Sequence, residues 1–275
     1  MSTRFPARLH AVLASQAPVG VVFRRGPAKS VCSVLWDRAT DRFTLGQWLR
    51  GRIYERRADI SPDGKHLIYF AMNGRWHSSE TRGSWTAISR VPWLKAETLH
   101  GKGDCWQGGG LFLSNSQYWL NGGDCHFPVR DAAQVRWDRN YQPFAHYGGE
   151  CLSVYYVRLQ RDGWKLKRLQ KRSEKFSTFE KELPKGWILR KLAHADVVHP
   201  PGAGCYWDEH EMVHPKHDRY LPFPEWEWAE LDGKTLVWAE KGCLYRAPLY
   251  DRSLGPVKVL YDFNEMTFER RIAPY

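Results

Sequence analysis

The sequence lacks the features that mark several common classes of protein. Its six cysteines form no C-x-x-C pair, which excludes a zinc knuckle and a thioredoxin-like redox motif. No stretch approaches the roughly 20 apolar residues that a membrane-spanning helix needs, and the apolar run of residues 11–14 is too short for a signal peptide. These absences predict a cytoplasmic protein with free thiols and no membrane contact.

Sequence patterns for catalysis or cofactor binding are also missing. Neither G-x-S-x-G nor a Cys/His/Asn protease pattern occurs. The glycines of residues 103–110 and 122–123 form neither a dinucleotide fingerprint nor a phosphate loop. Turns between strands explain the related stretches Gly103–Trp106 and Gly123–His126, although the sequence leaves open whether Cys105 meets Cys125. We therefore expect no cofactor and no catalytic residue.

What the sequence does contain is a repeated hairpin. Residues 57–70, RADISPDGKHLIYF, return as AELDGKTLVWAEKGCLYRAP from residue 229 onward. In both copies an Asp-Gly-Lys turn precedes an alternating run, a pattern typical of a tight turn between two strands. Leu67 and Tyr69 match Leu236 and Trp238, and we expect all four to be buried. The match extends further, since residues 88–92 align with residues 244–248.

Weaker repeats of the same kind cover the rest of the chain. Strand-like runs occupy residues 19–24, 31–36 and 43–48. The second strand of each unit provides an anchor, at Cys32, Leu67, Leu111, Leu152, Tyr206 and Leu236. The average step is about 41 residues, with an insertion expected near residues 172–187. Repeats of this length with several short strands are typical of a β-propeller, in which six blades are favoured over five.

The repeats also resemble a known family. SPDGKHLIYF, followed by a third strand with aromatic residues, resembles the repeats of TolB-like β-propellers over residues 57–99 and 226–261. Two of about six units match well. The resemblance implies an all-β, closed β-propeller over residues 19–275, and a role as a platform that binds partners. We expect residues 1–18 to form a leader, with a short helix over residues 5–16.

One stretch carries the H-E-x-x-H pattern of zinc metalloproteases, at His210, Glu211 and His214. On a helix the two imidazoles would face one way. Pro215 follows directly, however, and the repeat spacing places the stretch on strands, where residues i and i+4 lie roughly 13 Å apart. A zinc-dependent hydrolase is therefore only a remote alternative, and no metal site is predicted.

Titratable residues also cluster around the H-E-x-x-H stretch and at the pair Glu225 and Glu227. Histidines and an acid surround the H-E-x-x-H stretch, at His194, Asp196, His199 and His217, and we interpret them as surface residues of an acidic segment. Glu225 and Glu227 would share one strand face about 7 Å apart, a spacing compatible with a glycosidase pair. We expect residues 223–230 instead to form the inner strand of the last blade.

The net charge of +11 is unevenly distributed along the chain. Residues 158–191 carry a charge of +8, whereas residues 196–240 carry −7. The predicted partner-binding residues lie in the first of these segments, on two strands of unit four: Arg158, Arg161, Lys165, Lys167, Arg168, Lys171 and Arg172. The alternative is an edge strand that lysines protect from mispairing.

The charge distribution also ranks the classes of partner. The basic segment and its neighbours Trp164 and Trp187 would suit a nucleic acid. The acidic segment that follows would repel a polyanion, whereas a protein partner accommodates both signs. The sequence thus favours a non-catalytic platform for a protein partner within a larger assembly, with nucleic-acid binding as the alternative.

Overall fold

The structure is a computed structural model that describes residues 5–26, 29–132, 134–148, 150–171, 175–195 and 205–275. Strands make up 51% of the chain and helices 7%, far below the roughly 30% helix of an average globular protein. The prediction of an all-β protein is confirmed. The described part contains one α-helix, α1 (Leu152–Arg161), and three 3₁₀ turns, η1 (Gly123–Cys125), η2 (Pro184–Gly186) and η3 (Pro215–His217).

The chain divides into two compact units that each contain one end of the chain and most of the opposite half. Unit 1 comprises the described residues of 1–10 and 159–265, and unit 2 comprises those of 11–158 and 266–275. The N-terminal residues therefore complete the unit built from the C-terminal half, and the C-terminal residues complete the other.

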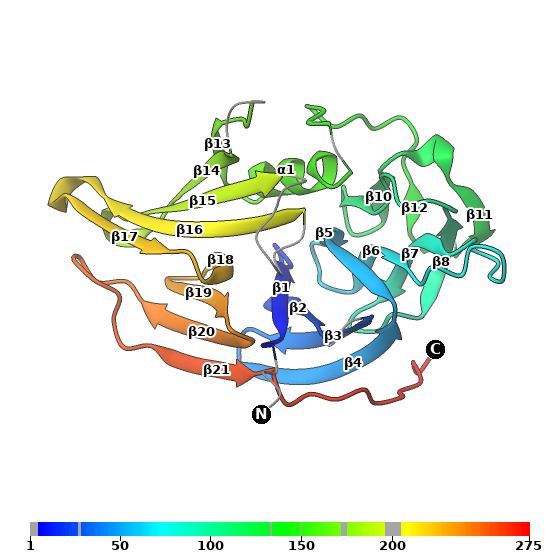
Figure 1. Ribbon diagram of the computed structural model, residues 1–275, viewed down its shortest axis with the longest axis horizontal. Helices are drawn as coiled ribbons and strands as arrows, with labels where there is room; N and C mark the ends of the chain where they lie inside the picture. Colours follow the sequence, from blue (N-terminus) through cyan, green and yellow to red (C-terminus); the bar gives the residue numbers. More distant parts are fainter. Residues whose placement is uncertain (1–4, 27–28, 133, 149, 172–174, 196–204) are drawn as a thin grey trace. The chain divides into compact units, whose positions relative to one another are not determined.

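Three sheets lie wholly or mostly in unit 2 (Figure 1). The first has the order β1-β2-β3-β4, formed by Arg8–Leu13, Val19–Arg25, Ser30–Asp37 and Arg42–Arg50. The second has the order β11-β8-β7-β6-β5, formed by Phe127–Arg130, Ala96–Gly101, Ser84–Arg90, His66–Met72 and Arg52–Ile60. The third has the order β12-β10-β9, formed by Arg136–Trp137, Gln117–Leu120 and Gly110–Phe112, and its β10–β12 pair is parallel. The three runs predicted as strands before residue 50 are thus confirmed.

Two sheets lie in unit 1, and their strands follow the order of the chain. The fourth sheet contains β13 (Lys165–Arg168), β14 (Phe176–Glu182), β15 (Ile188–Ala195), β16 (Tyr206–His214) and β17 (Arg219–Phe223). The fifth contains β18 (Trp226–Asp232), β19 (Thr235–Glu240), β20 (Cys243–Pro248) and β21 (Lys258–Asp262). Every neighbouring pair in these two sheets is antiparallel, so each sheet is a meander.

The largest core of unit 2 forms around the first two sheets. Val21, Phe23 and Leu67 belong to one buried cluster that includes residues of β2, β3, β5, β6, β7 and β8. Tyr69 lies in the same cluster, and its hydroxyl donates a 2.5 Å hydrogen bond to the backbone oxygen of Leu94. The alternating apolar residues of these strands bury one face of each sheet, which supplies the main stabilising free energy of the unit.

Both copies of the repeated hairpin form as predicted. In the first copy, β5 and β6 pair through Ile60 and Leu67 at the turn, where Gly64 has a φ of +74°. In the second copy, β18 and β19 pair through Asp232 and Thr235, and Gly233 has a φ of +62°. A positive φ favours glycine, which explains the Asp-Gly-Lys sequence at both turns. The predicted burial of Leu67, Tyr69, Leu236 and Trp238 is confirmed, with 0%, 1%, 0% and 4% exposure.

Beyond the hairpins, the alignment of the two copies is displaced. Leu67 pairs with Ser89 on β7, and Leu236 pairs with Ala247 on β20. In the structure Arg90 is therefore equivalent to Pro248. The sequence alignment instead matches Arg90 with Arg246, two residues earlier. Because a shift of two residues keeps every side chain on its original face, the pattern of buried positions survives this displacement.

The strand before the first turn carries a bulge and a buried arginine. Residues 55–58 interrupt the pairing of β5 with β6. The Arg57 side chain, fully buried, donates hydrogen bonds to Glu150 Oε2 and Cys105 O, both at 2.8 Å, to Cys151 Sγ at 3.1 Å and to Gln107 O. Its guanidinium also packs over the rings of Tyr54 and Phe70. A buried cation needs this many partners, because its desolvation is costly.

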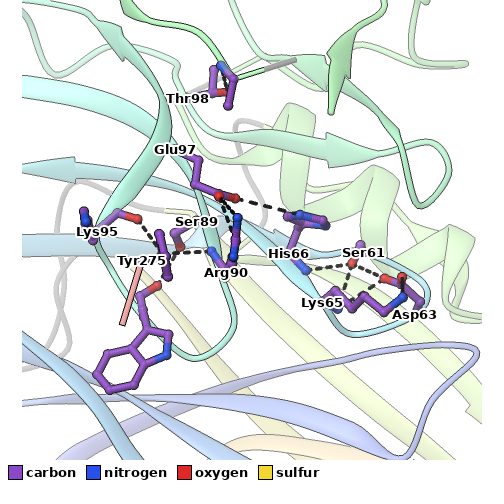
Figure 2. A network of polar contacts seen from close by, with 12 residues as sticks. Ser61, Asp63, Lys65, His66, Ser89, Arg90, Lys95, Glu97, Thr98 and Tyr275 are labelled. Carbon is purple, nitrogen blue, oxygen red and sulfur yellow. Dashed lines mark hydrogen bonds and ion pairs between the residues drawn. The ribbon is translucent and has the colours of Figure 1, made fainter. Parts of the chain in front are cut away.

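The two ends of the chain are each attached by specific contacts. In unit 1, the backbone N–H of Ala7 donates to Asn264 Oδ1 at 2.9 Å, and that of Leu9 donates to Glu227 Oε2 at 3.0 Å. In unit 2, the Tyr275 hydroxyl accepts from the backbone N–H of Arg90 at 3.0 Å and donates to Lys95 O at 2.7 Å (Figure 2). Ala7, Leu9 and Tyr275 are therefore each held in the folded structure.

The prediction of a short helix over residues 5–16 is wrong. Residues 8–13 form β1, the first strand of the first sheet, and Leu9, Ala11 and Val12 are buried. The segment is too short for its helical pattern to decide the structure, and tertiary pairing with a sheet overrides such weak local preferences.

The prediction of a strand at residues 150–156 is also wrong, because Leu152 belongs to α1. Most of α1 is buried, including Val154, Tyr155 and Tyr156, and a short apolar run does not distinguish a buried helix from a buried strand. The expected insertion near residues 172–187 contains the regular strand β14. As a result the described residues contain five sheets, rather than the six favoured by the anchors.

Candidate functional site

The H-E-x-x-H stretch lies on a single strand, β16, which pairs with both β15 and β17. His210 and His214 are buried on one face of the strand, whereas Glu211 points to the other. The Glu211 carboxylate accepts hydrogen bonds from Arg190 at 3.1 Å and from the Tyr220 hydroxyl at 2.7 Å. The glutamate therefore does not share a site with the two imidazoles.

Both nitrogens of His210 are occupied by protein groups. Nδ1 lies 2.8 Å from the backbone oxygen of Trp226, and Nε2 lies 2.8 Å from Lys191 Nζ. Because a carbonyl only accepts, Nδ1 carries the proton and Nε2 accepts from the ammonium. The buried Lys191 is further stabilised by Asp208, 3.7 Å away, and by the ring of Trp164. The lone pair of His210 Nε2 accepts the hydrogen bond from Lys191, so it is not available to a metal ion.

The other histidines of the segment are engaged separately. His214 Nε2 donates to the backbone oxygen of Lys185 at 2.8 Å. His194 is buried, which corrects its interpretation as a surface residue, and it stacks on Trp207 with ring centroids 4.3 Å apart. His217 lies beside His214. Asp196 and His199 lie outside the described residues. Among the residues that the structure describes, no group of three or more potential ligands could hold a metal ion.

The basic segment divides between a helix and a strand. Arg158 and Arg161 lie on α1, not on a strand as predicted. Arg158 is buried and donates to the backbone oxygen of Ala58 within unit 2. It is therefore not part of an exposed basic surface, which corrects that prediction. Arg161 pairs with Asp162 at 2.9 Å.

The remaining basic residues lie at or after the edge strand β13. Lys165 pairs with Glu182 at 2.6 Å, and Lys167 lies 3.6 Å from Glu180. The Arg168 guanidinium packs over a phenylalanine ring, Lys171 is exposed, and Arg172 lies outside the described residues. Acidic neighbours on β14 thus offset part of the charge, as expected for lysines that protect an edge strand. A partner-binding role for these residues stays a prediction.

One concave surface of unit 1 is a groove between the end of β17 and the fifth sheet. Its volume is about 420 Å³, within the usual range of ligand sites. We call it the aromatic groove and define it by its lining residues: Pro222, Phe223, Pro224, Glu225, Trp226, Trp238, Glu240, Tyr245, Leu254 and Val257.

Four of these side chains form a ladder of stacked rings. Phe223 stacks on Trp226 with centroids 3.8 Å apart, Trp226 on Trp238 at 4.7 Å, and Trp238 on Tyr245 at 5.5 Å, with interplanar angles of 8°, 20° and 14°. The ladder follows from the sheet, because Trp238 and Tyr245 are cross-strand partners on β19 and β20. The two tryptophans are buried, so the ladder is a rigid wall with its end rings partly exposed.

The charged residues of the aromatic groove are both acidic. Glu225 is exposed and forms no ion pair within the described part of the chain, and Glu240 lies 3.6 Å from Lys241 Nζ. Glu227, by contrast, accepts the backbone N–H of Leu9 and does not line the groove. The two carboxylates considered for a glycosidase pair therefore have different environments. The strand predicted over residues 223–230 forms only in part: residues 226–232 are β18 of the fifth sheet, whereas Phe223 ends β17 of the fourth sheet and residues 224–225 form a turn.

The chemistry of the aromatic groove is suited to binding. Its described lining contains no histidine, cysteine, serine or lysine that could act as a nucleophile or a base near neutral pH. Rigid aromatic rings and carboxylates instead offer apolar contacts and attraction for cations. The indole N–H of the buried Trp238 has no acceptor among the described residues.

The aromatic groove is not predicted by the sequence patterns. Its aromatic residues come from four different segments, and nothing in the chain order shows that their rings stack. Tyr245 is the cross-strand partner of Trp238, and Trp226 pairs with Glu240, two residues beyond Trp238. This arrangement becomes visible only when the strand register is known.

Comparison with known proteins adds no further assignment, since no protein family model and no curated protein matches the chain. The six cysteines are free, including Cys105 and Cys125. Among the described residues, no helix is long and apolar enough to cross a membrane.

Proposed function

We propose that the chain is a closed β-propeller that binds a protein partner and catalyses no reaction. The observation that carries this proposal is the aromatic groove, which combines a rigid wall of stacked rings with the exposed carboxylate of Glu225, and whose described lining contains no histidine, cysteine, serine or lysine. Tyrosine and tryptophan are enriched at the energetic centres of protein interfaces, because they bury much apolar area at little entropic cost.

The propeller architecture is supported by the sheets and by the chain ends. Each of the five described sheets is formed mainly by strands that are consecutive in sequence, as in the blades of a propeller. Each end of the chain also completes the unit built from the opposite half. A ring of blades requires such a connection between its first and last parts, and we therefore propose five blades.

The charges favour a protein over a nucleic acid as the partner. The groove presents Glu225 and Glu240, which repel phosphates. Lys165 and Lys167, which would attract phosphates, already face Glu182 and Glu180. We propose that the protein acts in the cytoplasm as part of a larger assembly, in line with the platform role that the TolB-like resemblance implies.

Affinity capture from a lysate, with and without nuclease, tests this function. The baits are the wild-type protein, Tyr245→Ala and the matched control Phe144→Ala, since Phe144 is 64% exposed and lies in unit 2. We expect a protein that survives nuclease, that Phe144→Ala retains and that Tyr245→Ala loses.

Two results would contradict the proposal. If nuclease empties the eluate, the partner is a nucleic acid. If all three baits retain the same proteins, the groove is not the binding surface. Thermal unfolding of each bait shows whether a loss of binding reflects a loss of folding.

A further inference from the structure

We propose that the aromatic groove binds a proline-rich segment of the partner that carries arginine or lysine. The inference rests on the proposed function and specifies the chemistry of the partner. It combines three properties of the groove: its charge, its rigidity and its shallow shape.

The negative charge of the groove favours a positively charged segment as its ligand. The charged residues that line the groove, Glu225 and Glu240, are both acidic. Glu225 is exposed and has no ion-pair partner within the described chain, so it is available to a cation from another molecule. A complementary positive charge would fix the orientation of the bound segment and speed its association.

The walls of the groove favour proline and other apolar side chains. The ladder holds the rings of Trp226 and Trp238 in place through contacts on both sides, so they lose little freedom when a partner binds. The half-buried rings of Phe223 and Tyr245, at the two ends of the ladder, offer flat apolar surfaces. Aromatic-lined grooves of this kind bind proline-rich segments in other protein classes.

The apolar surface continues beyond the groove along the edge strand β21. Val257 lines the groove, and Val259 is the cross-strand partner of Tyr245. Val257 directly precedes β21, and Val257 and Val259 are 56% and 55% exposed. Exposed neighbouring valines of this kind indicate a contact surface rather than a core, and they extend the path available to an elongated segment.

The limited depth of the groove selects for a segment that is already extended. A flexible peptide loses much conformational entropy when it is fixed in one conformation, and a groove of about 420 Å³ offers little buried area in return. A polyproline II segment is extended before it binds and loses less. Proline therefore contributes twice, through its contacts and through its stiffness.

Three short synthetic peptides separate these contributions: repeats of Arg-Pro-Pro, of Glu-Pro-Pro and of Arg-Gly-Gly. Titration calorimetry measures the binding of each peptide. We expect the Arg-Pro-Pro peptide to bind at least about tenfold more tightly than either of the others, the ratio that corresponds to one good contact.

Two matched variants locate the site. Glu225→Lys should weaken the Arg-Pro-Pro peptide about fivefold or more, the usual scale of a partly solvated ion pair. Glu80→Lys makes the same charge change at an exposed position of unit 2 and should leave binding unchanged. Both positions are exposed, so neither variant should affect folding.

Each contrary result overturns a defined part of the inference. Equal binding of Arg-Pro-Pro and Arg-Gly-Gly removes the requirement for proline, and equal binding of Arg-Pro-Pro and Glu-Pro-Pro removes that for positive charge. Equal effects of Glu225→Lys and Glu80→Lys show that the groove is not the site. If no peptide binds although Tyr245→Ala still loses a captured protein, the inference fails and the proposed function stands.

Discussion

The two copies of the Asp-Gly-Lys hairpin have nearly the same sequence at the turn and serve different purposes. Arg57 stands six residues before Asp63, and Trp226 stands six residues before Asp232. The first copy uses this position to bury a cation among hydrogen-bond acceptors in unit 2, and the second uses it to place a ring in the aromatic ladder of unit 1. The turn sequence thus determines the hairpin, and the preceding strand determines the environment.

The largest expected effect comes from removing the buried cation of the first copy. Arg57→Met leaves the acceptors Glu150 Oε2 and Cys105 O without their donor, which should lower the free energy of unfolding by about 3–5 kcal/mol. Chemical denaturation measures this change. Arg52→Met, at an exposed position of the same strand, is the control and should cost less than about 1 kcal/mol. Equal effects of the two variants would show that the bulge does not depend on Arg57.

A pH-dependent effect should distinguish the strands that follow the two hairpins. Thr86 on β7 lies 3.0 Å from His126 Nε2, whereas the equivalent residue on β20 is Leu244. Burial lowers the pKa of His126 from 6.5 to about 4. The folded state therefore disfavours the imidazolium, and its stability should fall as the pH drops from about 6.5 towards 4.

The size of this effect at pH 4 should be about 3 kcal/mol, and it should be absent above pH 7. His126→Gln should reduce the dependence of stability on pH. This dependence is measured as the change in melting temperature between pH 7 and pH 4. Burial also lowers the pKa of His100, which faces His126 together with Lys102 and Asp104, so the difference between wild type and variant is the relevant quantity. The exposed His77→Gln is the control, and an unchanged pH profile in His126→Gln would contradict the assignment.

The smallest effect concerns the turns themselves. In the first copy, the buried Ser61 hydroxyl accepts the backbone N–H groups of Lys65 at 3.1 Å and His66 at 2.9 Å and donates to Asp63 at 2.7 Å (Figure 2). Ser61→Ala should therefore cost about 1–2 kcal/mol.

The second copy provides the matched substitution. Thr235 makes one side-chain hydrogen bond, at 3.0 Å to the backbone oxygen of Asp232, and Thr235→Ala should cost less than about 0.5 kcal/mol. Denaturation of both variants gives the comparison. A larger loss in Thr235→Ala than in Ser61→Ala would show that the two turns are not stabilised as described.

The sequence predicted what depends on local pattern. The alternation of apolar and polar residues around Leu67 and Leu236 identified the strands, their turns and the buried positions. In a strand every second side chain lies on the same face, so this alternation shows which residues are buried. The same reasoning excluded a helix at His210–His214. It failed for residues 8–13 and for α1, where short apolar runs fit more than one structure and the contacts of distant segments decide.

The aromatic groove lay beyond the reach of local pattern for a related reason. Trp238 stacks on both Trp226 and Tyr245, and this arrangement depends on which residues pair across the strands. The alignment of the two repeats was displaced by two residues on the third strand, and such a shift preserves burial but changes every neighbour. Burial is thus predictable from the sequence at positions where contact partners are not.

The exchange of chain ends has a consequence for synthesis on the ribosome. Leu9 is made early, but Glu227, the acceptor of its backbone N–H, follows 218 residues later. At the usual rates of translation this interval lasts about 10–40 s. Throughout that time β1 can pair with its neighbour β2 in the first sheet, but the hydrogen bonds of Ala7 and Leu9 to Asn264 and Glu227 cannot form. Slower elongation would prolong the period in which the first described residues lack these contacts.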